Sequence, residues 1–396
     1  MQNVDAAGLG IGDDHPTRIM GVLNVSSESP YDPSVFADTV EAADYVEDEL
    51  VAEGADVVDV GLESANKRFE VLDAAAELER LETALEVIET TSTDVVWSIE
   101  TRYHEVAEAA IDGGFDVIND IAGFADPEMP SVAAEYDVAV VKMASPPDIT
   151  RPGAVEETPW AERRDPAWAE SADYVDMVYE ALKQNGLTDK TIVDPAFGGW
   201  SETKTLEDDR ETFRRLREFR GLDRPMLVSI NRKNFLRTLT DRSTEEALPV
   251  SLAATAMAIE RGAHVVRTHD VRETVDAAAV GDAFTPRRRS RTDTVEVAEL
   301  DARTSRDVAR HEERLGTGEV APDATALVFE VHGLSTTSTE LLASLADDAG
   351  ATFAAGRAGD GGLLAGTTRS LRSLANCNVA DESVVVVLDC VGDAVA

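Results

Sequence analysis

Eight short apolar segments recur between residues 18 and 271, and stretches with helical periodicity separate them. Their near-continuous hydrophobicity is typical of strands in a parallel sheet that is covered on both faces. Eight strand–helix units in succession favour a closed barrel, because an open doubly wound sheet usually has about five or six strands. The sequence therefore predicts an α/β fold, a (β/α)8 TIM barrel. The expected strands are residues 18–25, 56–61, 95–99, 117–121, 138–143, 191–196, 226–230 and 265–269.

The barrel pattern ends at Phe284, and about a hundred residues follow it. A basic, proline-containing stretch after Phe284 indicates a linker. We expect a barrel at residues 1–284, a linker at 285–294 and a small α/β domain at 295–396. In that domain, apolar runs at 326–331 and 383–388 predict strands, and the stretches 338–349 and 363–375 predict helices. The first seventeen residues contain three glycines and are expected to form a short hairpin at the barrel floor.

The chain is strongly acidic, with 77 Asp and Glu against 36 Lys and Arg and a formal net charge of −41. This charge excludes nucleic acid as a partner. The acidic residues are spread evenly, which predicts adaptation to high salt, because ~1 M salt shortens the Debye length to about 3 Å and weakens self-repulsion. The two cysteines, Cys377 and Cys390, belong to no metal-binding or redox motif. With no signal peptide and no membrane-spanning apolar run, these features predict a halophilic, cytoplasmic protein without membrane contact.

Polar or ionisable side chains follow nearly every expected strand. In parallel barrels, catalytic groups collect at the carboxyl ends of the strands. The carboxylates and amides among them could hold the donor and acceptor edge of a flat heterocycle such as an amino-pyrimidinone. Some of these acids, such as Glu63 and Asp120, could instead cap the helix that follows. The residues expected in the ring are Asn24, Asp59, Glu100, Asn119, Asp194, Lys233, Arg267 and His269.

The last strand places Arg267 and His269 on the same face, because side chains alternate along a strand. An arginine fork beside a histidine suits a phosphate or diphosphate. An Arg267–Asp270 ion pair beside a structural histidine explains the same residues equally well. Lys233 is one of only six lysines and follows the seventh strand, which favours a place in the site. Asn24 and a diphosphate could together hold Mg²⁺, which keeps several waters and uses phosphate oxygens.

Taken together, these motifs resemble dihydropteroate synthase across residues 18–284. The resemblance implies that Asn24 is associated with Mg²⁺ and the diphosphate, that Asn119, Asp194 and Lys233 bind the pterin, and that Arg267 and His269 hold the diphosphate. It also implies condensation of 6-hydroxymethyl-7,8-dihydropterin diphosphate with p-aminobenzoate, in a possible homodimer. The matching motifs are residues 20–25, 59–64, 118–121, 194–195, 232–233 and 267–270.

The chain departs from the family pattern mainly near the expected arylamine. The usual Ser-Thr-Arg-Pro-Gly loop is replaced by Ser-Ala-Asn-Lys-Arg at residues 64–68, where Lys67 or Arg68 could substitute. Glu100 stands where aspartate is usual, and alanine follows Met143 in place of histidine. Asn231 replaces a serine. The expected substrate-binding residues are Asn24, Lys67, Arg68, Glu100, Asn119, Met143, Asp194, Asn231 and Arg232, with Lys233, Arg267 and His269 as catalytic residues.

Two other functions fit parts of the pattern. A pterin-dependent methyltransferase has a similar barrel, but it needs no diphosphate clamp, so Arg267 and His269 count against it. A non-catalytic pterin-binding paralogue is favoured by the altered arylamine loop. Product formation from the pterin diphosphate and p-aminobenzoate separates these functions.

Overall fold

The computed structural model describes residues 2–25, 34–36, 38–63, 71–198, 201, 203–285, 289–292, 294–356 and 361–395. The chain forms two compact units, residues 1–299 and 300–396. The first unit contains the predicted barrel, and the second contains a separate small sheet with its own apolar core.

The barrel consists of eight parallel strands in the order β8-β7-β6-β5-β4-β3-β10-β9. A parallel bridge between Val193 and Met226 joins the two ends of this order, so the ring closes. All eight strands lie where the sequence predicts them, which confirms the barrel. Their bounds are β3 (Arg18–Asn24), β4 (Val57–Gly61), β5 (Val96–Thr101), β6 (Val117–Asp120), β7 (Ala139–Met143), β8 (Thr191–Asp194), β9 (Leu227–Val228) and β10 (Val265–Thr268).

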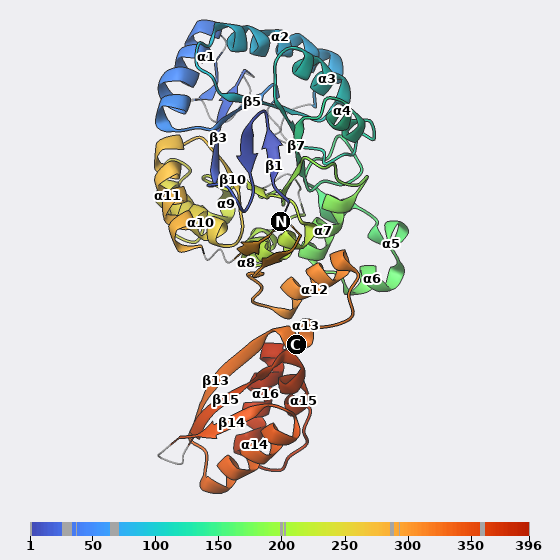
Figure 1. Ribbon diagram of the computed structural model, residues 1–396, viewed down its shortest axis with the longest axis vertical. Helices are drawn as coiled ribbons and strands as arrows, with labels where there is room; N and C mark the ends of the chain where they lie inside the picture. Colours follow the sequence, from blue (N-terminus) through green and yellow to red (C-terminus); the bar gives the residue numbers. More distant parts are fainter. Residues whose placement is uncertain are drawn as a thin grey trace. The chain divides into compact units, whose positions relative to one another are not determined.

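Helices surround the strands, as Figure 1 shows. Their starts are fixed locally: the side chains of Asp38 and Asp73 accept backbone amides at the first turns of α1 and α2. The main helices of this unit are α1 (Thr39–Tyr45, continuing as a π-helix at Val46–Val51), α2 (Ala74–Thr90), α3 (His104–Asp112), α4 (Met129–Glu135), α5 (Trp160–Arg163), α6 (Pro166–Ser171), α7 (Tyr174–Lys183), α8 (Leu206–Arg214), α9 (Asn234–Arg237), α10 (Leu248–Glu260) and α11 (Val271–Phe284). Short 3-10 helices occupy Val155–Glu157 and Leu216–Leu222.

The predicted N-terminal hairpin is confirmed. Strands β1 (Val4–Ala6) and β2 (Leu9–Ile11) pair antiparallel. Val4, Ala6 and Ile11 are buried in one apolar cluster with inward-facing residues from the start of the barrel strands, such as Met20 and Val265. Figure 1 shows β1 in front of the barrel strands. The hairpin therefore closes the floor of the barrel and leaves the opposite end, where the strands have their carboxyl ends, for ligands.

The second unit has a three-stranded antiparallel sheet in the order β13-β15-β14. The prediction of a strand at residues 383–388 is wrong, because these residues form part of a helix. The run of β-branched residues favours a strand, but four apolar side chains are buried at helical spacing: Val384, Leu388, Val391 and Val395. The helix predicted at 363–375 begins only at Thr368, after a strand. The elements are α12 (Ser305–Leu315), α13 (Ala321–Ala324), β13 (Ala326–His332), α14 (Thr336–Asp348), β14 (Thr352–Ala355), β15 (Gly361–Thr367), α15 (Thr368–Ala375) and α16 (Glu382–Val395).

The expected linker contains ordered backbone. Strand β11 (Arg289–Arg291) pairs antiparallel with β12 (Glu296–Ala298). Hydrogen bonds between backbone groups do not require a periodic pattern of apolar side chains. The basic, polar sequence therefore gave no sign of this hairpin. Residues 289–298 therefore include a short hairpin, and the division between the two units follows Glu299.

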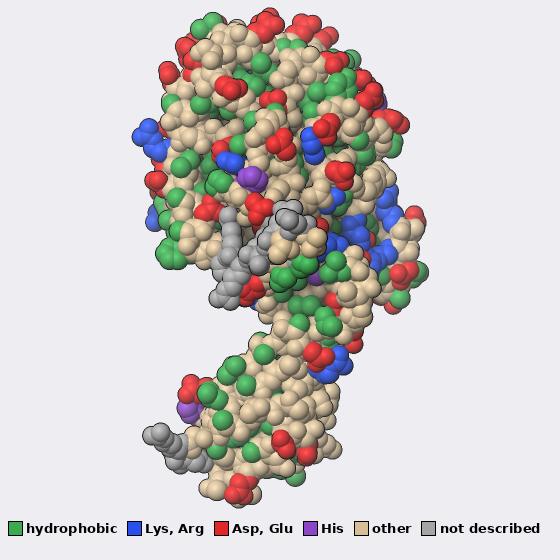
Figure 2. Space-filling view, in the orientation of Figure 1, with side chains coloured by type: hydrophobic (Ala, Val, Ile, Leu, Met, Phe, Trp, Pro, Cys, Tyr) green, Lys and Arg blue, Asp and Glu red, His purple; other side chains and the backbone are tan. Residues whose placement is uncertain are grey.

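The surface matches the composition. Figure 2 shows acidic side chains scattered over the visible face of the barrel unit rather than gathered into one patch. No helix within the described residues is long and apolar enough to cross a membrane.

Candidate active site

The predicted polar residues meet at the carboxyl ends of the barrel strands. Asn24 and Asp194 are the last residues of β3 and β8, and three others are the second-last residues of their strands. Parallel strands end at the same face of a barrel, so these side chains share one mouth. The second-last residues are Glu100 in β5, Asn119 in β6 and Arg267 in β10.

Asp59 in β4 is the hub of this mouth. Its carboxylate accepts hydrogen bonds from Ser98 Oγ at 2.6 Å, Asn119 Nδ2 at 3.0 Å and Arg267 Nε at 2.7 Å. The side chain is fully buried. The sequence signal was a carboxylate between the valines of an apolar strand, and it indicated a ring member but not this central position.

Arg267 lies between two carboxylates. Its Nη2 donates to Glu100 Oε2 at 2.7 Å while its Nε binds Asp59. The alternative pairing of Arg267 with Asp270 is wrong, because Asp270 binds Arg232 instead. Burial raises the pKa of Glu100, and the positive charge of Arg267 opposes that shift. In this structure the carboxylate of Glu100 thus holds Arg267.

Asp194 and Lys233 form the other side of the mouth. Asp194 Oδ1 accepts the amide of Ala196 at 2.8 Å, and burial raises the pKa of Asp194 to about 6. Lys233 follows β9, and its side chain passes over the α-carbon of Gly198, where a Cβ would lie 3.1 Å from Nζ. Burial and the nearby Arg267 lower the pKa of Lys233.

The residues beside Lys233 and Arg267 are bound to one another. Arg232 donates to both oxygens of Asp270 at 2.8 Å, and Asn231 Nδ2 donates to Asp270 Oδ2 at 2.9 Å. Arg232 Nη1 also donates to the carbonyl oxygens of residues 244 and 245. The polar groups of Asn231 and Arg232 thus fix the loops after β9 and β10.

Burial lowers the pKa of His269 to about 3, so its imidazole is neutral at physiological pH.

The remaining predicted residues differ in position. Asn24 is buried and donates from Nδ2 to Ser34 Oγ at 2.9 Å. Met143 is buried in the main barrel core. Lys67 and Arg68 lie outside the described residues, as does the rest of the 64–68 loop.

The barrel unit is similar in sequence to known proteins. The family model described as "Pterin binding enzyme" matches residues 20–269. A dihydropteroate synthase of Streptococcus pyogenes serotype M3 is 30% identical over 266 residues, which are 66% of this chain and 93% of that protein. The chain belongs to the dihydropteroate synthases of the pterin-binding enzyme family.

Two further dihydropteroate synthase relatives extend the comparison. A probable bifunctional folylpolyglutamate synthase/dihydropteroate synthase of Halobacterium salinarum is 36% identical over 268 residues, 67% of this chain and 31% of that protein. The chain spans about a third of the length of this relative. The structure of the Xanthomonas albilineans dihydropteroate synthase in complex with 7,8-dihydropteroate superposes with a TM-score of 0.53 at 30% identity, covering 71% of this chain and 98% of that one.

Beside this candidate site, a second set of charges is buried between β5 and α2. Sequence reasoning named only Glu63 of this set, as a possible helix cap, and that alternative is wrong because Asp73 caps α2. Arg102 is 1% exposed and its Nη2 binds Glu63 Oε2 at 2.8 Å. Glu77, also 1% exposed, accepts a hydrogen bond from Thr101 Oγ1 at 2.5 Å. Helical periodicity gave no signal for Glu77, because it stands among alanines and glutamates on a surface-like helix turn.

Glu77 should make stability depend on pH. Burial raises its pKa from 4.5 to about 7, so the folded state binds one more proton than the unfolded state between these pH values. Stability from this group is therefore present at low pH and lost as pH rises through 7, by about 3 kcal/mol in total. We expect Glu77→Gln, which keeps an acceptor for Thr101, to unfold at higher denaturant concentration than wild type at pH 8. The wild-type protein should have a higher free energy of unfolding at pH 5 than at pH 8, and this difference should be smaller in the variant. An equal difference in the two proteins would show that Glu77 does not cause it.

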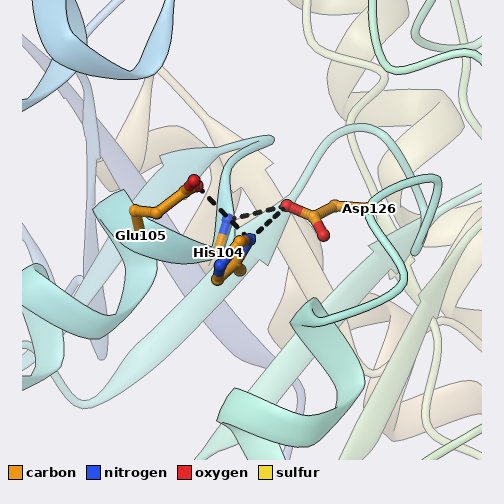
Figure 3. A group of neighbouring side chains, drawn as sticks. All are labelled: His104, Glu105 and Asp126. Atoms are coloured by element: carbon orange, nitrogen blue, oxygen red, sulfur yellow. Dashed lines mark hydrogen bonds and ion pairs between the residues drawn. The ribbon is translucent and has the colours of Figure 1, made fainter.

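His104, Glu105 and Asp126 form a cluster outside the strand-end ring (Figure 3). Asp126 Oδ2 accepts the backbone amide of His104 at 3.0 Å and lies 2.8 Å from His104 Nδ1. Its Oδ1 accepts the amide of Glu128. Asp126 therefore caps the first turn of α3 from a neighbouring loop, which accounts for the cluster without a bound ion. Asp120 accepts the amides of residues 122–124, which form a turn and not a helix. The alternative that Asp120 caps the following helix is therefore wrong, because α4 begins only at Met129.

Proposed function

We propose that this chain condenses 6-hydroxymethyl-7,8-dihydropterin diphosphate with p-aminobenzoate to give dihydropteroate and pyrophosphate. The observation that carries the proposal is the meeting of Asp59, Asn119, Asp194, Lys233 and Arg267 at one end of the barrel. Membership of the dihydropteroate synthases supports it, as does the Xanthomonas relative in complex with 7,8-dihydropteroate.

The pterin ring needs paired donors and acceptors along its edge. The Asp194 carboxylate can accept two parallel N–H bonds from the amino-pyrimidinone, and the Asn119 amide offers both a donor and an acceptor. The Lys233 ammonium can donate to a ring acceptor beside Asp194. Buried polar groups of this kind discriminate strongly, because a ligand without the matching edge leaves them unpaired.

The reaction breaks the bond between the pterin methylene carbon and the diphosphate oxygen. The electron pair leaves with the diphosphate, and the methylene carbon becomes cation-like. The arylamine nitrogen then forms the new carbon–nitrogen bond and loses a proton to solvent water. Arg267 supplies positive charge and the neutral His269 a hydrogen bond for the departing diphosphate, so electrostatic stabilisation and positioning provide the acceleration without a covalent enzyme intermediate.

Mg²⁺ is the expected cofactor, and Asn24 is the residue that would hold it. The Asn24 Oδ1 atom faces the α-carbon of Gly61, and a Cβ there would come within 2.7 Å of that oxygen. Glycine thus keeps space beside an amide oxygen, a ligand that hard cations accept. When bound, Mg²⁺ would neutralise negative charge on the diphosphate.

The proposed setting is the high-salt cytoplasm, and the proposed assembly is a homodimer. The net charge of −41 supports the high-salt setting.

Exposed apolar side chains support the homodimer: Met257 on α10 and Val280 and Phe284 on α11. The two helices pack closely, since a Cβ on Gly281 would lie 2.8 Å from Ile259 Cβ. Sedimentation in molar KCl measures the assembly state directly.

The activity test uses the full chain purified in molar KCl. With Mg²⁺, the pterin diphosphate and p-aminobenzoate, we expect dihydropteroate by mass spectrometry, and none when either substrate is omitted. Tight pterin binding without product would instead support a non-catalytic pterin-binding protein. Methyl transfer from a methylated pterin, without condensation, would identify a methyltransferase.

The altered loop after β4 leads to a prediction about the arylamine. Lys67 and Arg68 are the cations nearest in sequence to the arginine of the usual loop. If either binds the p-aminobenzoate carboxylate, Lys67→Ala or Arg68→Ala should raise the KM for p-aminobenzoate about 10- to 100-fold, since a charge-assisted hydrogen bond contributes about 1.5–3 kcal/mol. The KM for the pterin diphosphate should stay unchanged. Unchanged KM values in both variants would reject this role.

A further inference from the structure

A buried ion pair between Lys204 and Asp209 lies behind the proposed pterin site. Lys204 precedes α8 and Asp209 lies in its first turn, with 2.7 Å between Nζ and Oδ1. The two side chains are 2% and 5% exposed. Burial of two charges costs desolvation energy that the attraction between them offsets only partly, so such a pair contributes little net stability. Its location therefore needs another explanation.

Both members of the pair hold the backbone turn at residues 196–198. Lys204 Nζ donates to the carbonyl oxygen of Ala196 at 2.5 Å. The amide of Gly198 donates to both Asp209 carboxylate oxygens, at 3.2 and 3.3 Å. Ala196 and Gly198 have φ values of 62° and 111°, a region that residues with a side chain rarely adopt. A turn with this strained alanine persists only where surrounding groups hold it.

The same turn supports both pterin-binding candidates. The amide of Ala196 donates to Asp194 Oδ1 at 2.8 Å. On the other side, a Cβ on Gly198 would lie 3.1 Å from Lys233 Nζ and 3.3 Å from its Cδ. A movement of the turn would therefore displace the carboxylate and the ammonium together.

The electrostatic surroundings of Lys233 give Asp209 a second effect. Burial lowers the pKa of Lys233 and Arg267 lowers it further, whereas the carboxylates of Asp209 and Asp194 raise it. When Asp194 binds the pterin edge, the negative charge of Asp209 still favours the ammonium form of Lys233. The charged or titratable groups that face Lys233 are Arg267 and His269 at the end of β10, Asp194 of β8, Glu100 of β5, and Lys204 and Asp209 beside α8.

We propose that Lys204 and Asp209 are positioning residues that fix the 196–198 turn and so keep Lys233 charged and aligned for the pterin. The inference rests on the proposed function, because it takes the pterin as the ligand of Lys233. Neither residue is expected to touch the substrate.

The test compares pH profiles of Asp209→Asn and wild type, both as full chains with Mg²⁺ in molar KCl. We expect the KM for the pterin diphosphate to rise ~10–100-fold, as small misplacements do, while the KM for p-aminobenzoate stays constant. The alkaline limb of the profile is the fall in pterin diphosphate binding at high pH. The midpoint of this limb should move to a lower pH by about one unit, because Lys233 loses a facing carboxylate. Asp209→Glu keeps the charge and should keep the wild-type alkaline limb. Glu211→Gln, which removes an exposed carboxylate from the same helix, is the matched control.

Each outcome decides the inference. A folded Asp209→Asn variant that loses thermal stability but keeps the wild-type KM and alkaline limb would show a purely structural pair and overturn it. If the asparagine variant does not fold, Asp209→Glu carries the test, because its longer side chain displaces the Gly198 amide while it keeps the charge. A raised KM for the pterin diphosphate is then expected, and a wild-type KM would overturn the inference. Wild-type protein that binds no pterin diphosphate would instead refute the proposed function on which the inference rests.

Discussion

Lys233→Ala should weaken binding of the pterin diphosphate by at least ~100-fold, because a charge-assisted hydrogen bond and the alignment it gives are lost together. The fold should persist. Burial and Arg267 already disfavour the charged form of Lys233 in the folded protein, so its removal relieves an unfavourable burial. Isothermal titration with the pterin diphosphate measures the loss, and Asp194→Ala should behave similarly because the carboxylate faces the same ligand edge.

The control for this prediction is Lys183→Ala, which removes a half-exposed lysine from α7. It should bind the pterin diphosphate as wild type does. Unfolding of Lys233→Ala and Asp194→Ala, with no specific loss of binding in folded protein, would show that these groups support the structure rather than the ligand.

Arg267→Met should damage both stability and activity. Without the guanidinium, the buried carboxylates of Asp59 and Glu100 lose their cation, and an uncompensated buried charge typically costs about 3–5 kcal/mol. The thermal midpoint of the barrel should fall on the order of 10 °C at neutral pH. The deficit should shrink as the pH falls, because burial raises the pKa of Glu100 and protonation removes that charge.

A double variant separates the two effects of Arg267. Arg267→Met with Glu100→Gln removes one of the unpaired charges and should recover part of the stability without recovering turnover. A single Arg267→Met variant with the wild-type thermal midpoint at pH 8 would contradict the charge network around Asp59.

The barrel could be predicted from the sequence because its signal is repeated. Each strand is a short apolar run, and each is buried on both faces, so eight independent segments indicate the same architecture. The run at 383–388 had no such repetition to correct it. There, β-branched residues favoured a strand, while the packing of Val384 and Leu388 against the second core selected a helix.

The membership of the site was predictable, but the pairing within it was not. Alternation along β10 indicates that Arg267 points into the barrel, yet it does not say which carboxylate it meets. The partners, Asp59 and Glu100, come from β4 and β5, which are not neighbours of β10 in the sheet. Such contacts across the lumen depend on the register of the whole ring. The Lys204–Asp209 pair was hidden for a similar reason, since only the turn at 196–198 brings it beside Lys233.

The proposed condensation releases its two products in a fixed ratio. Full-length protein in molar KCl, with Mg²⁺, the pterin diphosphate and p-aminobenzoate, should release one pyrophosphate for each dihydropteroate formed, and Lys233→Ala should release neither at an appreciable rate. Saturable binding of the pterin diphosphate by the wild-type protein, with no dihydropteroate formed at saturating p-aminobenzoate, would show that the protein binds the pterin without condensing it.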